Sequence, residues 1–142
     1  MKLTMLRLIT ALLVFLFFYT AIAKLTDLGT FERELLNQTV PRWSVPLLLW
    51  LIPSAELLSV GLLLSPPVRI LGLYLSACMM LVFTTYMGLV LLKIFERVPC
   101  SCGGVLKSMG FGFHFIFNMF FFLLSLTGIW LMRSMRRRQH PD

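Results

Sequence analysis

The sequence predicts an all-α fold, a polytopic membrane protein built as a bundle of four transmembrane helices. Hydrophobic residues make up 58% of the 142 residues and charged residues only 13%, about half the charged share of a typical soluble domain. Four apolar stretches are each long enough, at about 20 residues, to cross a hydrocarbon core of about 30 Å. They cover residues 6–23, 46–64, 68–92 and 111–132, and we expect one domain over residues 1–142.

The first stretch, residues 6–23, has two interpretations. It ends in Ala21-Ile22-Ala23, a pattern that is also typical of a cleaved signal peptide. Because its apolar run is about as long as a full span, we interpret it as the first transmembrane helix. The polar segment that follows places three apolar residues at helical spacing, which predicts a short interfacial helix before Pro41. These residues are Phe31, Leu35 and Leu36.

The remaining three spans are separated by segments of very different length. Only Ser65-Pro66-Pro67 divides the second span from the third, so these two are expected to form an antiparallel hairpin. The fourth span is preceded by a longer polar segment and is followed by a cluster of arginines. Trp43 and Trp130 fall near opposite membrane interfaces, where aromatic belts are found.

The basic residues indicate how the chain is oriented. Seven flank the spans on the side of the termini and six fall on the other side, where acidic residues dilute them. The dense terminal clusters favour a cytoplasmic location for both termini. The seven are Lys2, Arg7, Arg69, Arg133, Arg136, Arg137 and Arg138. Because the charge flanks membrane spans, the net charge of +7 does not predict nucleic-acid binding.

The pair Cys100 and Cys102 lies in the turn Val98-Pro99-Cys100-Ser101-Cys102-Gly103-Gly104, which the charge pattern places outside the cytoplasm. On a helix, two residues that are two positions apart point about 200° away from each other, so their thiols cannot meet. In a strand the same step separates the Cα atoms by about 6.6 Å, which is at the upper edge of disulfide geometry. A disulfide here would be strained and would close too small a ring to stabilise the fold. Strained disulfides are the labile or catalytic ones.

Three interpretations of this pair remain open from the residues alone. The first is thiol–disulfide exchange, because Arg97, Lys107 and the start of the fourth span all favour a thiolate. The second is a metal site, for which Cys100, Cys102 and His114 are at hand, with Met109 as a soft fourth ligand. The third is a structural or inert pair.

Glu56 is the one acidic residue deep in a span, about ten residues into the second stretch and hence about 15 Å from its end. An ionisable group at such depth is costly and marks a candidate functional site. Lys24, at the outer end of the first span, is its candidate partner. The pair could fix helix register, or Glu56 could serve a proton relay or a quinone site.

Two polar residues of the fourth span, His114 and Asn118, are four positions apart and therefore share a helix face. His114, near the outer end, is a candidate to stabilise a thiolate of the Cys-x-Cys turn or to donate to a quinone carbonyl. A plain packing role, with hydrogen bonds to neighbouring helices, is the alternative for both. Cys78, in the middle of the third span, is expected to be a buried, non-catalytic thiol.

These residues resemble the MauE branch of the DoxX-like membrane proteins over roughly residues 23–122. The resemblance implies a four-helix membrane bundle associated with redox work on the outer side, since MauE is implicated in maturing methylamine dehydrogenase and DoxX-type subunits are linked to quinones. Many members have Cys-x-Cys-Phe-Gly where this chain has Gly103-Gly104, so the redox class is implied more firmly than the methylamine pathway. The matching segments are Lys24-Leu25-x-Asp27, Pro53-x-x-Glu56-Leu57-Leu58 and Pro99-Cys100-Ser101-Cys102-Gly103-Gly104 with His114 and Asn118.

The functional hypothesis is a bacterial inner-membrane protein that exchanges electrons with a thioredoxin-like or other disulfide-containing extracytoplasmic partner. Cys100, Cys102 and His114 are the candidate catalytic residues. A quinone is the candidate electron sink, with Glu56, Lys24 and Asn118 as candidate binding residues. The alternatives are a non-enzymatic membrane scaffold or assembly factor for a redox partner, and a Cys/His metal-binding protein.

Overall fold

The computed structural model describes residues 1–94 and 110–139, and every regular element within these ranges is a helix. The helices are α1 (Lys2–Thr26), α2 (Leu28–Leu36), the 3-10 turn η1 (Arg42–Ser44), α3 (Val45–Leu64), the 3-10 turn η2 (Pro66–Val68), α4 (Arg69–Leu91) and α5 (Phe111–Gln139). The predicted all-α class is confirmed. The long helices extend a few residues beyond the predicted apolar stretches at α1 and α5, where polar and basic residues continue the helix.

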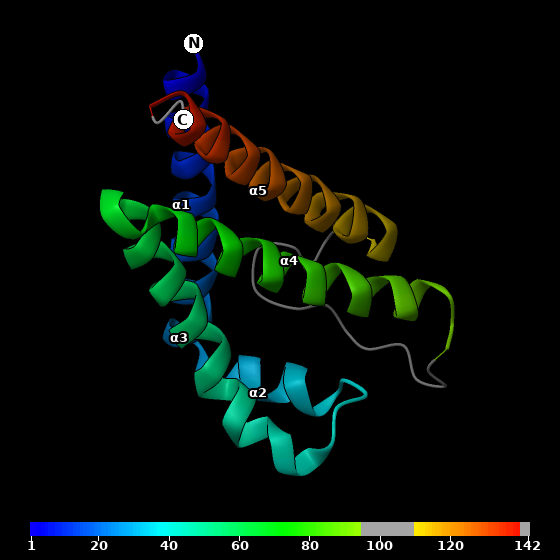
Figure 1. Ribbon diagram of the computed structural model, residues 1–142. Helices are drawn as coiled ribbons and strands as arrows, with labels where there is room; N and C mark the ends of the chain where they lie inside the picture. The colour runs from blue at the N-terminus through cyan, green and yellow to red at the C-terminus, as the bar shows by residue number, and fades with distance from the viewer. Residues whose placement is uncertain (95–109, 140–142) are drawn as a thin grey trace.

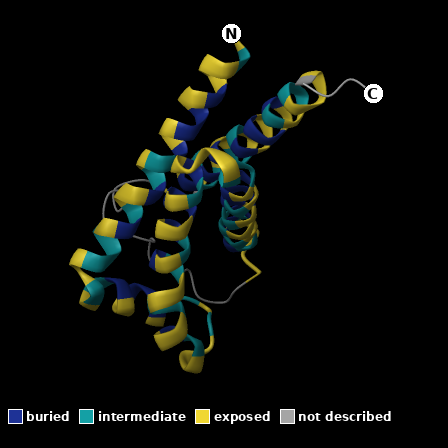
Figure 2. Cartoon of the chain, turned by 60° about the vertical axis from the view of Figure 1, so that its left-hand side comes forward, coloured by how far each residue is buried: buried dark blue, intermediate teal, exposed yellow. Residues whose placement is uncertain are grey.

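Four of these helices are long and apolar enough to cross a membrane. The mean hydropathy of their best windows is 1.8 to 2.2, yet only 28 to 39% of each window is buried inside the protein. Many large apolar residues of the spans, such as Phe15, Trp50 and Phe120, are therefore exposed, and exposed residues recur along every span (Figure 2). A water-soluble protein would bury such residues, whereas a membrane protein presents them to lipid. The chain is a multi-pass membrane protein.

The spans pack in a ring of neighbouring pairs. Helix α1 packs along α3, α3 along α4, α4 along α5, and α5 returns to α1 (Figure 1). The shared core includes Leu13 and Phe17 of α1, Leu63 of α3, Leu73 of α4 and Phe121 of α5. The start of α1 and the end of α5 meet at one end of the molecule, where the Lys2 ammonium donates to Ser134 Oγ at 3.0 Å.

Two glycines allow the closest helix contacts. A Cβ on Gly72 of α4 would lie 2.8 Å from the backbone nitrogen of Leu63 in α3, so the predicted hairpin brings backbone against backbone here. A Cβ on Gly128 of α5 would lie 2.9 Å from Leu73 Cδ2 and 3.2 Å from Ile9 Cγ2. Small residues at helix interfaces are typical of membrane bundles, where close packing replaces the hydrophobic effect as the attractive force.

Helix α2 is the predicted short helix between the first two spans. Asp27 ends α1 and caps α2, because its carboxylate accepts from the Thr30 amide at 3.0 Å. Phe31 and Leu35 are buried against Val45 and its neighbours at the start of α3, while Leu36 is exposed. The helix thus covers one end of the α1–α3 pair, opposite to the end where the termini meet (Figure 1).

A buried polar layer as the candidate functional site

The centre of the candidate site is an ion pair between α1 and α3. Lys24 Nζ lies 2.6 Å from Glu56 Oε1, and the two side chains are only 12% and 2% exposed. Phe31 of α2 lies beside the pair, with its ring centroid 5.8 Å from the ammonium. Because each charge would be costly if left alone in an apolar surrounding, the two helices are held in the register that keeps the charges together.

Thr20, one helical turn before Lys24, adds a third group to this pair. Its hydroxyl lies 3.1 Å from Glu56 Oε1 and 3.0 Å from the carbonyl oxygen of Leu16. The hydroxyl has one proton, so donation to the carboxylate competes with donation to the backbone. Both interactions that reach Glu56 involve the same oxygen, Oε1. The other oxygen, Oε2, is buried and has no hydrogen-bond partner among the described residues.

His114 and Asn118 of α5 face the same interior. Both are only 6% exposed, and His114 lies in the first turn of α5, where its amide donates to Gly110 O at 3.1 Å. The shared face of His114 and Asn118 therefore points inward, as their spacing of four residues predicted.

Thr84 supplies the contribution of α4. Two contacts set the register of α4 against α5: a Cβ on Gly88 would be 3.4 Å from the Phe115 ring, and a Cβ on Gly128 would be 2.9 Å from Leu73 Cδ2. The two helices therefore run antiparallel. This register places residue 84 at the level of residue 118. Thr84 is 5% exposed, and its hydroxyl has no hydrogen-bond partner within the described ranges. All four spans thus carry buried or partly buried polar side chains in the half of the bundle away from the termini. We call this set the polar layer, and it comprises Thr20, Lys24, Glu56, Thr84, His114 and Asn118.

Chemically, this layer combines a fixed cation, a carboxylate with one free oxygen, an imidazole and an amide inside an apolar bundle. A buried carboxylate oxygen without a donor can accept a hydrogen bond from a hydroxyl, and an ammonium can donate to a carbonyl. Such groups can also pass protons. The layer lies at the end of the bundle where α4 finishes and α5 begins, the two helices that the segment carrying Cys100 and Cys102 connects.

The sequence-predicted residues fall into three groups in the structure. Lys24 and Glu56 are in contact, and His114 and Asn118 are buried in the same layer. Cys100 and Cys102 lie outside the described residues. Cys78 was expected to be buried, and this expectation was wrong, because its thiol is on the exposed side of α4. Ser76 and Ala77 take the inward positions instead, and the helical turn places Cys78 on the outer face.

Sequence reasoning did not select Thr20 or assign Thr84 to the layer. Thr20 could have been found, since it precedes Lys24 by four residues and therefore lies on the same helix face. Thr84 stands beside Thr85, and no pattern separates the two. In the structure Thr85 donates to Leu81 O of its own helix and is exposed, whereas Thr84 points inward.

Fold and polar layer together define the class of this protein, a polytopic all-α membrane protein with an ionisable cluster inside a four-span bundle. The family described as methylamine utilisation protein MauE matches residues 2–131. The chain belongs to this MauE family. No curated protein and no solved structure matches the chain.

Proposed function

We propose that this MauE-family protein is a membrane thiol–disulfide oxidoreductase that acts through Cys100 and Cys102. Its proposed partner is a thioredoxin-like or other disulfide-containing protein on the extracytoplasmic side of the bacterial inner membrane. The four spans would act as one domain that holds the cysteine segment at the membrane surface. The observation that carries the proposal is the buried polar layer at the end of the bundle from which this cysteine segment departs.

The exchange proceeds in two thiol–disulfide steps. The thiolate of one cysteine attacks a sulfur of the partner's disulfide and forms a mixed disulfide, and the released partner sulfur takes up a proton. The second cysteine then attacks its neighbour's sulfur in the mixed disulfide. A Cys100–Cys102 disulfide forms and the partner leaves as a dithiol, so two electrons and two protons move to the partner. The reverse sequence oxidises the partner.

A quinone is the electron acceptor that we propose for the oxidising direction. It would take two electrons and two protons from the reduced cysteine pair and leave as the hydroquinone, while the Cys100–Cys102 disulfide forms again. Glu56 Oε2 and the Lys24 ammonium support this proposal, because a free buried acceptor beside a donor matches a hydroquinone hydroxyl and a quinone carbonyl. Asn118 adds a buried amide in α5.

The test is the redox state of the two cysteines in the purified full-length protein. Reduced protein is mixed with a soluble quinone analogue, and free thiols are counted by alkylation and mass spectrometry. We expect the loss of two thiols per chain with matching formation of hydroquinone. The variant Cys78→Ser is the matched control, since it removes the exposed thiol of α4 and should behave as the parent protein does.

Two results would overturn this proposal. If Cys100→Ser and Cys102→Ser leave quinone reduction and exchange with a model disulfide unchanged, the pair is not redox-active. If the parent protein keeps stoichiometric zinc or copper that protects both thiols from alkylation, the pair belongs to a metal site.

A further inference from the structure

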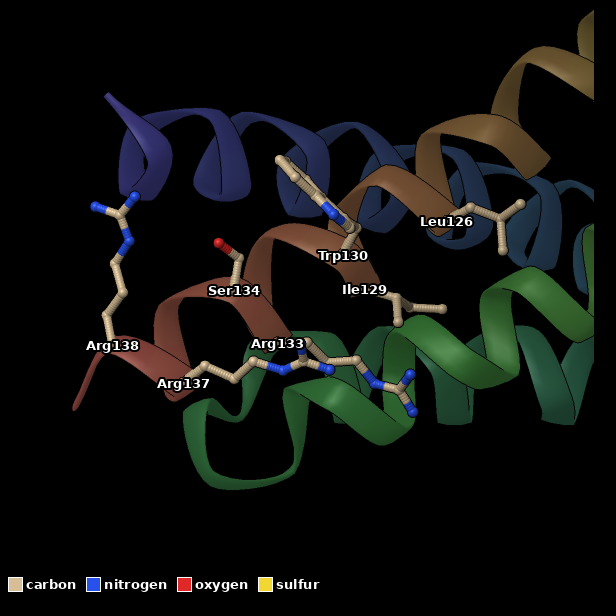
Figure 3. A pocket seen from close by; sticks show the side chains of 7 residues that line it. All are labelled: Leu126, Ile129, Trp130, Arg133, Ser134, Arg137 and Arg138. Atoms are coloured by element: carbon tan, nitrogen blue, oxygen red, sulfur yellow. The ribbon is translucent and has the colours of Figure 1, made fainter. Parts of the chain in front are cut away.

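A cavity of about 490 Å³ opens at the opposite end of the bundle from the polar layer, beside the last turns of α5. Its membrane side is lined by Leu126, Ile129 and Trp130 (Figure 3). Its outer side is lined by Arg133, Ser134 and Arg137, with Arg138 at the edge. The lining therefore changes from apolar at Leu126 to strongly basic at Arg138, over about three helical turns.

The two arginines that frame this cavity point the same way. Arg133 and Arg137 are one turn apart, and both side chains extend toward α4 (Figure 3). The Arg133 guanidinium lies 5.4 Å from the centroid of the Tyr74 ring in α4, which fixes its direction. Like charges one helical turn apart repel one another, and an anion bound between them would relieve this repulsion.

No carboxylate in the described ranges supplies that anion. The described acidic residues lie in or beside α2 or in the polar layer at the other end, namely Asp27, Glu32, Glu34 and Glu56. The same end adds Lys2, which donates to Ser134 and lies 5.5 Å from the centroid of the Trp130 ring. The described part of the cavity thus has several cations and no compensating charge.

We infer that this cavity binds the phosphodiester headgroup of an anionic phospholipid from the adjoining leaflet. Guanidinium groups bind phosphate oxygens through paired, charge-assisted hydrogen bonds. The apolar half of the lining fits the start of the acyl chains, which a free phosphate would leave unused. Trp130 lies one turn before the arginines, as expected of an aromatic side chain at the headgroup level, and basic clusters next to the end of a span bind anionic lipid headgroups.

The experiment compares lipid retention by two double variants that each lose two positive charges. Full-length protein in a neutral detergent is titrated with phosphatidylglycerol or phosphatidylcholine, and bound lipid is counted by native mass spectrometry. Arg133→Gln with Arg137→Gln removes the two cavity guanidiniums. The matched control, Arg7→Gln with Arg136→Gln, removes two charges from the same end of the molecule outside this cavity.

We expect the parent protein to retain phosphatidylglycerol in preference to phosphatidylcholine. The cavity double variant should weaken this binding by roughly fivefold for each guanidinium removed, and the control should keep it. Equal losses in both double variants would show diffuse charge attraction and overturn the site. Equal thermal stabilisation of the parent by inorganic phosphate or glycerol phosphate, at the concentration at which phosphatidylglycerol acts, would overturn the lipid assignment.

The cavity variant is also checked for folding. Its thermal stability in detergent without added lipid should stay close to that of the parent, because neither arginine has an ion-pair partner in the described ranges and only the weak cation–π contact of Arg133 with Tyr74 is lost. If stability without lipid falls, lysine replacements at both positions provide the second measurement. They keep the charge but lose the paired donors, and retention of the full phosphatidylglycerol preference by these lysine variants would contradict a guanidinium site.

Discussion

Lys24 of α1 and Glu56 of α3 meet at 2.6 Å inside the bundle, and the carboxylate that joins them is 98% shielded. The pair leaves Glu56 Oε2 without a hydrogen-bond partner in the described ranges. A pair that served only to fix helix register would be expected to use both carboxylate oxygens, because an unsatisfied buried oxygen lowers stability. The free oxygen, which is buried inside the bundle, therefore favours a binding or proton-transfer role in addition to a structural one.

The first prediction concerns the coupling of this ion pair. Glu56→Gln leaves the Lys24 ammonium buried without a counter-charge and should lower the free energy of unfolding by about 3 kcal/mol, as should Lys24→Met. The double variant should lose clearly less than the two single losses combined, because the second change removes a charge that is already unpaired. Denaturation in detergent, followed by circular dichroism, measures all three.

An exposed acid provides the control for this cycle. Glu32 lies on the exposed side of α2, so Glu32→Gln combined with Lys24→Met should give additive losses. Additive losses in the Lys24 and Glu56 cycle as well would mean that the ion pair does not couple α1 to α3.

The second prediction concerns the backbone contact at Gly72. Gly72→Ala places a Cβ 2.8 Å from the backbone nitrogen of Leu63, and a rigid neighbour of this kind cannot move aside cheaply. We expect a loss of about 1 to 3 kcal/mol in the free energy of unfolding. Gly61→Ala is the matched change in α3, where a Cβ would meet open space, and it should cause no loss. Similar losses at both positions would point to a general intolerance of substitution rather than to this contact.

The fold was largely predictable from the sequence, for physical reasons that apply to all membrane helices. Apolar runs of spanning length and the short Ser65-Pro66-Pro67 turn determine where helices α3 and α4 begin and end. The spacing of Phe31 and Leu35 predicted α2. The inward face of each span was harder to predict, because lipid and protein interior are both apolar and the hydrophobic pattern does not distinguish them. Cys78 was misplaced for this reason.

The candidate site was predictable only where polar residues interrupt an apolar run. Glu56 and the His114 and Asn118 pair were identified in this way, and each lies in the interior. Threonine is tolerated on either face of a membrane helix because its hydroxyl can bond to its own backbone, as Thr85 does. The inward position of Thr84 therefore depends on how α4 is rotated against α5, and sequence alone does not fix that rotation.

The third prediction concerns membrane orientation. The start of α1, the α3–α4 turn and the end of α5 carry seven of the 13 basic residues in dense clusters, and we expect this end to face the cytoplasm. In a background without the native cysteines, Ser65→Cys should react with an impermeant maleimide only after cells are permeabilised. Ser44→Cys, a partly exposed position at the opposite end of α3, should react in intact cells. The reverse labelling pattern would invert the orientation and with it the proposed compartment of the redox partner.

The fourth prediction connects His114 to the cysteine pair. His114 is buried in the first turn of α5, and Cys102 precedes it by twelve residues. An imidazole close to a thiol favours the thiolate by accepting its proton, and the thiolate is the species that attacks a disulfide or an alkylating agent. His114→Phe should therefore shift the alkylation profile of the reactive cysteine to higher pH while leaving the amount of folded protein nearly unchanged.

Asn118→Leu, one turn further along the same face, is the control, and it should affect stability more than thiol reactivity. The measurement is the rate of iodoacetamide labelling between about pH 5 and 10 in the Cys78→Ser background, followed by mass spectrometry. If His114→Phe labels with the same pH profile as the parent, the histidine is a packing residue of the polar layer, and Arg97, Lys107 and the start of α5 remain as the groups that could activate the pair.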